Sequence, residues 1–440
     1  MPPWRQNDGL DAKDTLNALV SPPRDDTSFC VMESDGNGIM NHTLAPAADA
    51  GSWEQFVDQL KPLGSRLLNR LPKNLRNDPQ VVQEAWRLLL AGLVRATNDA
   101  VIGDRRYPIF VPELHIAQNI FQPNADTIYK TAMIDGSGTY RIKGHRGTVR
   151  MFMLGQLGPD TLRTGKPSPA LLQYDFDTLT HDEHGNFDVI VSQKCPDGHD
   201  GDWWELHPSA EKFMVRIVSC LWGEEREPRF GIDRLDVPPN KGRLPAADLA
   251  ERLAEIPMIA GNAACFFPDH VEELRQQGHI NSLKVVDFAN MTGLNRQSYY
   301  EGAYELADDE ALLVEVEIPP DVAYWSLILT NEIYETTDWY NNQSSLNDAQ
   351  ARLDGDGYFR AVISARDPGI HNWLDTSGNP RGAIQGRWFG TDERPTPKIR
   401  RVSFARIQAE LPEQTPVISK EEREAVLRAR RIHAQMRTIW

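Results

Sequence analysis

Helical spacing of apolar residues marks the first structured part of the chain. Within residues 51–106, Ser52 to Gln55 match a capping box, and Asp78 followed by Pro79 provides an N-cap and a first-turn proline. Behind each signal, apolar residues recur every three or four positions, as on the buried face of a helix. We therefore expect a helical region at 51–106. Residues 1–50 are polar and lack this period, so we expect an N-terminal arm there.

From residue 107 onward, short runs alternate apolar and polar residues, which is typical of half-buried strands. In residues 107–240 we expect strands at 139–142, 149–154, 187–191 and 213–220. In residues 307–440 we expect strands at 311–318, 323–330, 358–364, 384–389 and 402–407. Helical spacing returns at 246–256 and 269–277, within a connecting segment at 241–306. The pattern predicts a mainly β protein with helical additions, built from two antiparallel β-sandwich or jelly-roll-like domains.

The chain ends on a predicted helix. Ser419 to Glu422 form a second capping box, and an apolar stripe follows at Ala425, Ala429, Ile432, Met436 and Ile439. The opposite face is rich in arginine. We expect the stripe to dock, either on its own domain or against another copy of the chain. Together with the size of the β surfaces, it leads us to expect a homo-oligomer.

The composition and net charge of the chain limit the kinds of molecule that we expect it to bind. Of the 440 residues, 40% are hydrophobic, which is typical of a globular protein, and the formal net charge of −16 disfavours nucleic acid and anionic membranes. The N-terminus has no apolar signal region, and no stretch is long and apolar enough to span a bilayer. The four cysteines, Cys30, Cys195, Cys220 and Cys265, lie far apart without metal-ligand spacing. We expect a cytoplasmic protein with free thiols.

The usual cofactor motifs are missing from the sequence. It contains no phosphate-binding GxxxxGK[ST], no GxGxxG after a strand, no GxSxG and no HExxH. The glycine turns after Asp35 and Asp354 resemble calcium loops, but the twelfth positions are Pro46 and Ala365 where a glutamate is required. We therefore expect no metal site and no cofactor.

Two segments carry residues that a sandwich does not need for its turns. The first runs from Gln122 to Tyr129 and reads QPNADTIY, and the second runs from Asp367 to Asp375 and reads DPGIHNWLD, with Arg387 further on. The first resembles the signature of the domain-of-unknown-function 1254 family, and the second that of the domain-of-unknown-function 1214 family. Over residues 107–407 the resemblance implies two β-sandwich-like domains in a bacterial, often catabolic protein. Asp375 stands where that family usually has proline, and Trp388 where it usually has tyrosine.

These segments contain groups suited to proton transfer. Asp126 could orient Tyr129 or a water, and His371 could exchange protons near neutral pH. Arg387 could hold a carboxylate or phenolate. Asn124, Asn372 and Trp373 are candidate substrate-binding residues, Trp373 through its flat stacking face. The alternative is structural: Asn124 and Asp126 cap turns, Asn372 bonds the backbone and Trp373 plugs the sandwich end.

A third cluster lies at residues 331–343, after a predicted strand. It includes Tyr334, Trp339 and Tyr340, and its amide and aromatic side chains suit recognition of a hydroxylated or aromatic ligand. A plain exposed loop would more often carry glycine, serine and lysine. We treat these three as candidate substrate-binding residues.

The sequence leaves proton-transfer chemistry as its main functional hypothesis. We expect a cofactor-independent lyase that cleaves a C–C or C–O bond of a hydroxylated aromatic or apolar catabolite, with loss of a small aldehyde or water. The alternatives are a hydrolase of a similar small molecule and a non-enzymatic binding protein. We predict that Tyr129, Asp126, His371 and Arg387 surround one pocket, with the first three as catalytic residues.

Overall fold

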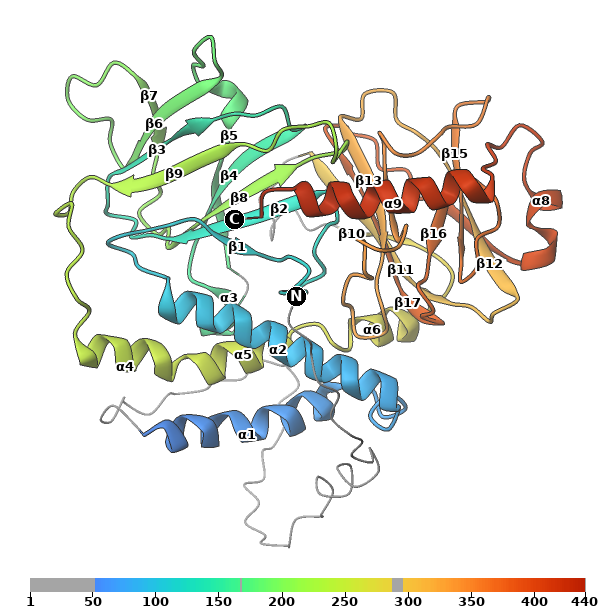
Figure 1. Ribbon diagram of the computed structural model, residues 1–440, viewed down its shortest axis with the longest axis horizontal. Coiled ribbons are helices and arrows are strands. Elements are labelled where there is room, and N and C mark those ends of the chain that lie inside the picture. Colours follow the sequence, from blue (N-terminus) through green and yellow to red (C-terminus); the bar gives the residue numbers. More distant parts are fainter. Residues whose placement is uncertain (1–51, 167, 287–295, 440) are drawn as a thin grey trace, which may run out of the picture. The chain divides into compact units, whose positions relative to one another are not determined.

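The computed structural model describes residues 52–166, 168–286 and 296–439 (Figure 1). The predicted N-terminal arm and Cys30 lie outside these residues. All described residues belong to one unit, residues 44–440. Strands and helices are mixed, with strands in four sheets, so the predicted class, mainly β with helical additions, is confirmed.

Two of the sheets form a first sandwich. One sheet has the strand order β1 (Val111–Glu113), β2 (Thr127–Met133), β8 (Lys212–Val218), β4 (Met151–Leu157) and β5 (Ala170–Asp175). The other has the order β7 (Asp202–Glu205), β6 (Asn186–Ser192), β3 (Tyr140–His145) and β9 (Arg229–Arg234). Pairing is antiparallel except between β6 and β7. Side chains from both sheets, among them Phe152, Val189 and Phe213, share one apolar core.

The other two sheets form a second sandwich. One has the order β10 (Lys284–Val286), β11 (Gln297–Glu305), β17 (Arg381–Phe389), β13 (Tyr324–Leu329) and β14 (Ser345–Asn347). Its partner has the order β16 (Trp373–Asp375), β15 (Tyr358–Ser364), β12 (Glu310–Glu317) and β18 (Lys398–Ser403). Only β15 and β16 pair in parallel. Leu312, Trp325 and Ile384 lie in the shared core.

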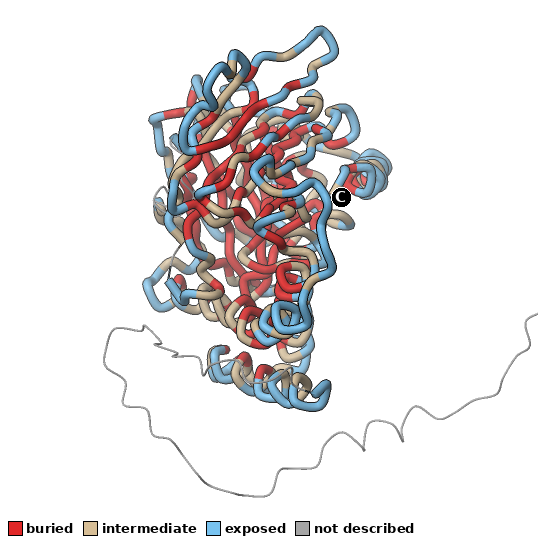
Figure 2. The backbone as a smooth tube through the Cα atoms, turned by 90° about the vertical axis from the view of Figure 1, so that its left-hand side faces the viewer, coloured by how far each residue is buried: buried red, intermediate tan, exposed pale blue. Residues whose placement is uncertain are grey.

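Helices pack together beside the sandwiches. Three of them, α1 (Trp53–Arg70), α2 (Pro79–Val101) and α5 (Ile256–Ala264), bury a common apolar cluster that includes Leu67, Leu88 and Ile259. Further helical elements are α3 (Thr161–Thr164), η1 (Phe176–Thr178), α4 (Ala246–Ala254), α6 (His270–Gln276), η2 (Phe404–Arg406) and α8 (Ile407–Glu410). The predicted caps are present: Ser52 forms a capping box on α1, and Asp78 caps α2 ahead of Pro79. Figure 2 shows buried positions throughout the strand-rich interior and exposed positions mainly in loops.

Two predicted elements differ from the structure. The strand expected at 402–407 begins earlier, at Lys398, and ends at Ser403, where the chain turns into η2 and α8. The helix expected at 246–256 ends at Ala254, and α5 begins directly behind Glu255 with Pro257 in its first turn. Pro257 has no backbone N–H, so it cannot donate the hydrogen bond to the preceding turn that would continue the first helix. The two helices are therefore separate.

The C-terminal helix α9 (Lys420–Met436) docks by the face opposite to the predicted one. Its capping box at Ser419 is present, but Ile432 and Met436 of the apolar stripe are 56% and 67% exposed. The buried face instead carries Arg423, Arg430 and, just past the helix, Arg437. These arginines donate hydrogen bonds to acceptors on the two sandwiches. Hydrogen bonding rather than apolar burial therefore attaches α9 to the rest of the protein.

Within the described residues, no helix is long and apolar enough to cross a membrane. Cys195, Cys220 and Cys265 are free thiols.

Candidate functional site

A sheet of the first sandwich and a sheet of the second face each other with their outer surfaces. A small cavity lies between these two surfaces. Its volume is about 40 Å³, and both sheets contribute residues to its wall. The first sandwich contributes Asn124, Thr127, Tyr129, Met151, Met153, Arg216 and Val218. The second contributes Gln297, Tyr299, Tyr324, Arg387 and Phe389.

Strand alternation explains how these side chains arrive there. Successive side chains of a strand point to opposite faces. On β2 and β8, Ile128 and Ile217 enter the first core, so their neighbours Tyr129 and Arg216 point outward into the cavity. On β17, Trp388 enters the second core and Arg387 points outward in the same way.

Gly386, which precedes Arg387, makes room for an aromatic ring. A Cβ at this position would lie 2.1 Å from the ring of Tyr300, which fills the second core. The sequence Gly386-Arg387-Trp388 therefore has three separate roles: space for Tyr300, a cationic group in the cavity, and a core side chain.

Tyr129 presents a phenol to the cavity without a protein partner. Among the described residues, no hydrogen bond to its hydroxyl is formed, whereas Tyr324 donates to Asp126 and Tyr299 accepts from Gln297. Burial raises the pKa of Tyr299 and raises that of Tyr324 well above its usual range. These two tyrosines are therefore neutral hydrogen-bonding groups, and the hydroxyl of Tyr129 is the one available to a ligand.

Asp126 lies one hydrogen bond behind the cavity and joins the two sandwiches. Its carboxylate accepts from Tyr324 Oη at 2.8 Å, Asn347 Nδ2 at 2.8 Å and Trp222 Nε1 at 3.1 Å. Asn124 donates to the same Tyr324 hydroxyl at 2.8 Å. Burial raises the pKa of Asp126, and the bonds from Tyr324 and Asn347 oppose that rise. Asp126 is fully enclosed, at 1% exposure, so it acts on a ligand only through Tyr324.

A second small cavity, of about 20 Å³, also reaches Thr127 and Tyr129. Its wall includes two of the predicted binding residues, Trp339 and Tyr340, and residues of the C-terminal segment, Arg437 and Ile439. Arg437 donates to the backbone carbonyls of Ala125 and Asp126 at 3.1 and 2.9 Å, which fixes the loop before β2. Trp339 and Tyr340 of the third sequence cluster and the C-terminal segment thus lie beside Tyr129.

Tyr334 belongs to a buried polar chain that ends at Arg387. Its hydroxyl contacts Glu301 at 3.4 Å and accepts from Gln385 Nε2 at 3.0 Å. The Gln385 carbonyl oxygen in turn accepts from Arg387 Nη2 at 3.0 Å. Tyr334 does not line the 40 Å³ cavity, and its contact with Arg387 is indirect.

His371, Asn372 and Trp373 lie away from this cavity. The Asn372 amide bonds the backbone of Arg352 and Arg360, as in the structural alternative. Trp373 Nε1 bonds Ser364, and its ring packs under Arg423 of α9. Within the described part of the chain, the ring of His371 hydrogen-bonds only to Asn372, and burial lowers its pKa. The predicted single pocket is therefore corrected: Tyr129 and Arg387 share it, Asp126 supports it, and His371 is elsewhere.

Arg216, Tyr299 and Tyr324 were missed by sequence reasoning. Arg216 is the most informative, because it stands between Val215 and Ile217 in a strand whose alternate positions are core residues. A cationic residue on the outer face of such a strand could have indicated a binding site. Tyr299 and Tyr324 gave none, since tyrosine is common in strands.

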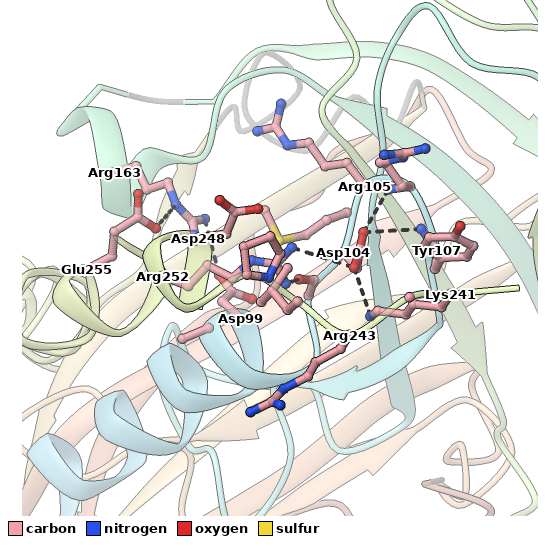
Figure 3. Close-up of a pocket in the computed structure, with 17 residues that line it drawn as sticks. Asp99, Asp104, Arg105, Tyr107, Arg163, Lys241, Arg243, Asp248, Arg252 and Glu255 are labelled. Atoms are coloured by element: carbon pink, nitrogen blue, oxygen red, sulfur yellow. Dashed lines mark hydrogen bonds and ion pairs between the residues drawn. The ribbon is translucent and has the colours of Figure 1, made fainter. Parts of the chain in front are cut away.

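A larger pocket, of about 550 Å³, lies between α2, α4 and the segment around Lys241 (Figure 3). Its charged side chains mostly neutralise one another: Arg163 pairs with Asp99 and Glu255, and Asp104 pairs with Lys241 and Arg252. Arg243 points away from this group in Figure 3. The lining groups do not converge on one point, so this pocket is a weaker candidate than the smaller cavity.

Residues 304–393 match the family described as "Protein of unknown function (DUF1214)". This range contains Tyr324 and Arg387, which form one wall of the cavity. The chain is similar to an uncharacterised protein from Burkholderia cenocepacia of known crystal structure, with 28% identity and a TM-score of 0.73 over 80% of this chain and 97% of that one. The VPA0106 protein from Vibrio parahaemolyticus has 14% identity and a TM-score of 0.40, over 73% and 98% of the two chains. No curated protein matches the sequence.

Proposed function

We propose that this protein is a cofactor-independent lyase for a small hydroxylated organic molecule, with Tyr129 as its acid–base group. The observation that carries the proposal is the hydroxyl of Tyr129, which has no protein partner among the described residues and shares a cavity with two guanidinium groups. A free phenol at a site that stabilises negative charge is what proton-transfer chemistry requires.

The proposed step is an acid–base cleavage. In a retro-aldol reaction, the substrate hydroxyl loses its proton, the C–C bond breaks and an aldehyde leaves. The electron pair of that bond forms an enolate, whose oxygen a guanidinium stabilises and whose carbon then takes up a proton. In a dehydration, a proton leaves the carbon next to an electron-withdrawing group, and the hydroxyl departs as water after protonation. Tyr129 carries the proton in either case: as the phenolate it takes the proton from the substrate, and as the phenol it returns that proton to the enolate carbon or to the departing hydroxyl.

The remaining expectations belong to the same proposal. The resemblance of residues 122–129 to the domain-of-unknown-function 1254 family supports a bacterial, often catabolic protein. The scattered cysteines and the apolar stripe of the last helix support, respectively, a cytoplasmic location and a homo-oligomer. A hydrolase and a non-enzymatic binding protein are the alternatives. An aromatic substrate requires the 40 Å³ cavity to widen, and the flexible side chains of Met151 and Met153 are suited to that.

The experiment is a turnover screen without added metal. Hydroxylated organic acids and alcohols are incubated with the full chain, and aldehyde release or loss of water is followed by derivatisation and mass spectrometry. With any substrate found, Tyr129→Phe is expected to lower turnover by about 10²-fold or more. Tyr358→Phe, which alters a hydroxyl whose only contact is a surface bond to Glu317, is the matched control.

The outcomes separate the three functions. Aldehyde or water release that depends on Tyr129 supports a lyase, incorporation of one solvent oxygen into one of the two products indicates a hydrolase, and saturable binding without product indicates a binding protein. Activity that a chelator abolishes and a divalent ion restores would contradict the expectation of a metal-independent reaction. Normal turnover by Tyr129→Phe would exclude the assigned acid–base role.

A further inference from the structure

Two guanidinium groups in the 40 Å³ cavity, those of the buried Arg387 and the half-buried Arg216, lack a counter-ion among the described residues. Among the described residues, neither Arg216 nor Arg387 forms an ion pair, and Nη1 of Arg216 and Nε of Arg387 are buried without any hydrogen-bond partner. Arg387 is 6% exposed, and its interactions are the bond to Gln385 and a position over the ring of Tyr299, 5.0 Å from the centroid. By contrast, the buried Arg95 and Arg360 have carboxylate partners.

The two charges also act on each other. Burial lowers the pKa of the Arg216 guanidinium, and the like charge of Arg387 lowers it further. Leaving a buried charge unpaired is costly, and placing two like charges together adds to that cost. A protein that keeps this arrangement gains stability when an anion enters. Both arginines come from central strands, β8 and β17, so they cannot withdraw into solvent.

We propose that Arg216 and Arg387 bind the carboxylate group of a small organic monoanion, one guanidinium from each sandwich. This assignment gives the substrate class of the proposed lyase. It rests on the proposed function only in the statement that this monoanion is the lyase substrate. A carboxylate matches the planar donor fork of a guanidinium, and its negative charge offsets the mutual repulsion of the two arginines.

The size and charge of the cavity favour a carboxylate over a phosphate. A volume of about 40 Å³ holds about three water-sized groups at roughly 10–15 Å³ each, which matches the three heavy atoms of a carboxylate. The remaining wall combines the apolar side chains of Met151, Met153, Val218 and Phe389 with the neutral polar side chains of Asn124, Thr127, Gln297 and three tyrosines. Asp126, one hydrogen bond behind Tyr324, offsets part of the positive charge. One negative charge is therefore enough to balance the site, and a dianion would exceed it.

The bound carboxylate places the reacting part of the molecule. Tyr129 lines the same cavity as both arginines, so a hydroxyl on the carbon chain next to the carboxylate comes within its reach. The same carboxylate, or the enolate formed next to it, stays under the two positive charges while the bond breaks. A β-hydroxy monocarboxylic acid is thus the substrate class that fits both the arginines and the phenol.

The test measures binding, without turnover. Sodium propanoate and benzoate are titrated into the full chain by calorimetry at constant ionic strength, with propanamide, chloride and inorganic phosphate in parallel. We expect saturable binding of one propanoate per chain and at least tenfold weaker binding of propanamide, chloride and phosphate. No saturable carboxylate binding, or equal affinity for chloride or phosphate, overturns the proposal.

Variants assign the binding to the two arginines. Arg216→Met and Arg387→Met are each expected to weaken propanoate binding at least tenfold, and Arg387→Lys to lie between Arg387→Met and the wild type, since it keeps the charge and loses the fork. Arg243→Met, at an exposed arginine outside this cavity, is the matched control and keeps wild-type affinity. Wild-type affinity in both methionine variants overturns the proposal.

A stability measurement distinguishes a loss of carboxylate binding from a folding defect. Because an unpaired buried charge is removed, Arg216→Met without ligand is expected to melt at the wild-type temperature or above it. A large loss of stability would identify Arg216 as a structural residue instead and overturn its role in binding. If the protein binds carboxylates but turns over no substrate, the carboxylate site stands and the proposed lyase activity is excluded. If it turns over only uncharged substrates, the lyase activity stands and the carboxylate site is excluded.

Discussion

Asp126 shows how one residue can belong to a site and to the fold at once. Its carboxylate lies where β2 of the first sandwich meets β13 and β14 of the second, and it accepts from Tyr324, Asn347 and Trp222. Asn347 and Trp222 have second acceptors in the carbonyls of Cys220 and Ser219. The hydroxyl of Tyr324 therefore depends most on Asp126, because it has no other acceptor in the described structure.

Replacing Asp126 by alanine should cost stability as well as activity. Tyr324 loses its acceptor in a dry environment, and we expect the free energy of unfolding to fall by about 1–3 kcal/mol, the usual cost of one unsatisfied buried group. Urea denaturation measures the change. Asp248→Ala, at an exposed aspartate, is the control and should stay within about 0.5 kcal/mol of the wild type. An unchanged midpoint for Asp126→Ala would show that the network does not hold the sandwiches together.

Asp375 makes the stability of the fold depend on pH. Burial raises the pKa of its carboxyl to about 6. The folded state therefore holds this proton at a pH where the unfolded state has released it, so the contribution of Asp375 is present at low pH and is lost as the pH rises through about 6. Asp375→Asn should gain stability relative to the wild type between pH 4 and pH 7. Parallel pH dependences of the two proteins in urea denaturation would contradict the assigned shift.

At the scale of elements, α9 depends on arginines spaced seven residues apart. Arg423 donates to the carbonyl of His371 and pairs with Asp367, and Arg430 donates to the carbonyl of Trp339 at 2.7 Å and lies over the ring of Trp222. Arg437 completes the row on the first sandwich. Residues at this spacing share one helix face. Figure 1 shows α9 lying along the second sandwich and the C-terminus beside β2 of the first.

Arg430→Ala should destabilise the protein, whereas Arg431→Ala should not. The alanine removes a charged hydrogen bond to a buried carbonyl, and we expect a loss of about 1.5–3 kcal/mol in the free energy of unfolding. Arg431 is exposed and contacts only Asn341 and its own helix, so its removal should change stability by about 0.5 kcal/mol or less. Equal effects in thermal denaturation would mean that the buried arginine face contributes no more than the exposed one.

The elements themselves could be predicted because their signals are local. The capping boxes at Ser52 and Ser419 and the alternation in 187–191 and 213–220 involve neighbours a few residues apart. The docking face of α9 could not be predicted in this way. Its arginine acceptors lie about 50 to 310 residues earlier in the chain, and an apolar stripe is normally the buried face.

The candidate site was predictable only in part for the same reason. Tyr129, Asp126 and Arg387 stand out as polar or aromatic residues beside turns and strands, but the facing of β8 against β17 decides that Arg216 joins them. His371 and Asn372 carried the same kind of signal, and they serve a corner of the second sandwich instead. Chemistry in the sequence identified candidates, and the packing of two sandwiches selected among them.

At the scale of the whole molecule, the exposed face of α9 bears on assembly. Ile432 and Met436 are 56% and 67% exposed, with Val426 on the same helix at 40%. Because the arginine face already fixes the helix to its own chain, this apolar face is free to meet a second copy. We therefore keep the expectation of a homo-oligomer and assign this face to its contact.

Light scattering tests that assignment. The wild type should have a mass above that of one chain over a wide concentration range, and Ile432→Asp combined with Met436→Asp should shift the mass to that of the monomer. Both side chains are exposed, so circular dichroism of the double variant should match the wild type. Arg428→Asp, at another exposed position of α9, makes the net charge more negative by the same amount as the double variant and should leave the mass unchanged. A monomeric wild type would refute the oligomer, and an oligomeric double variant would place its contact on a sheet surface instead.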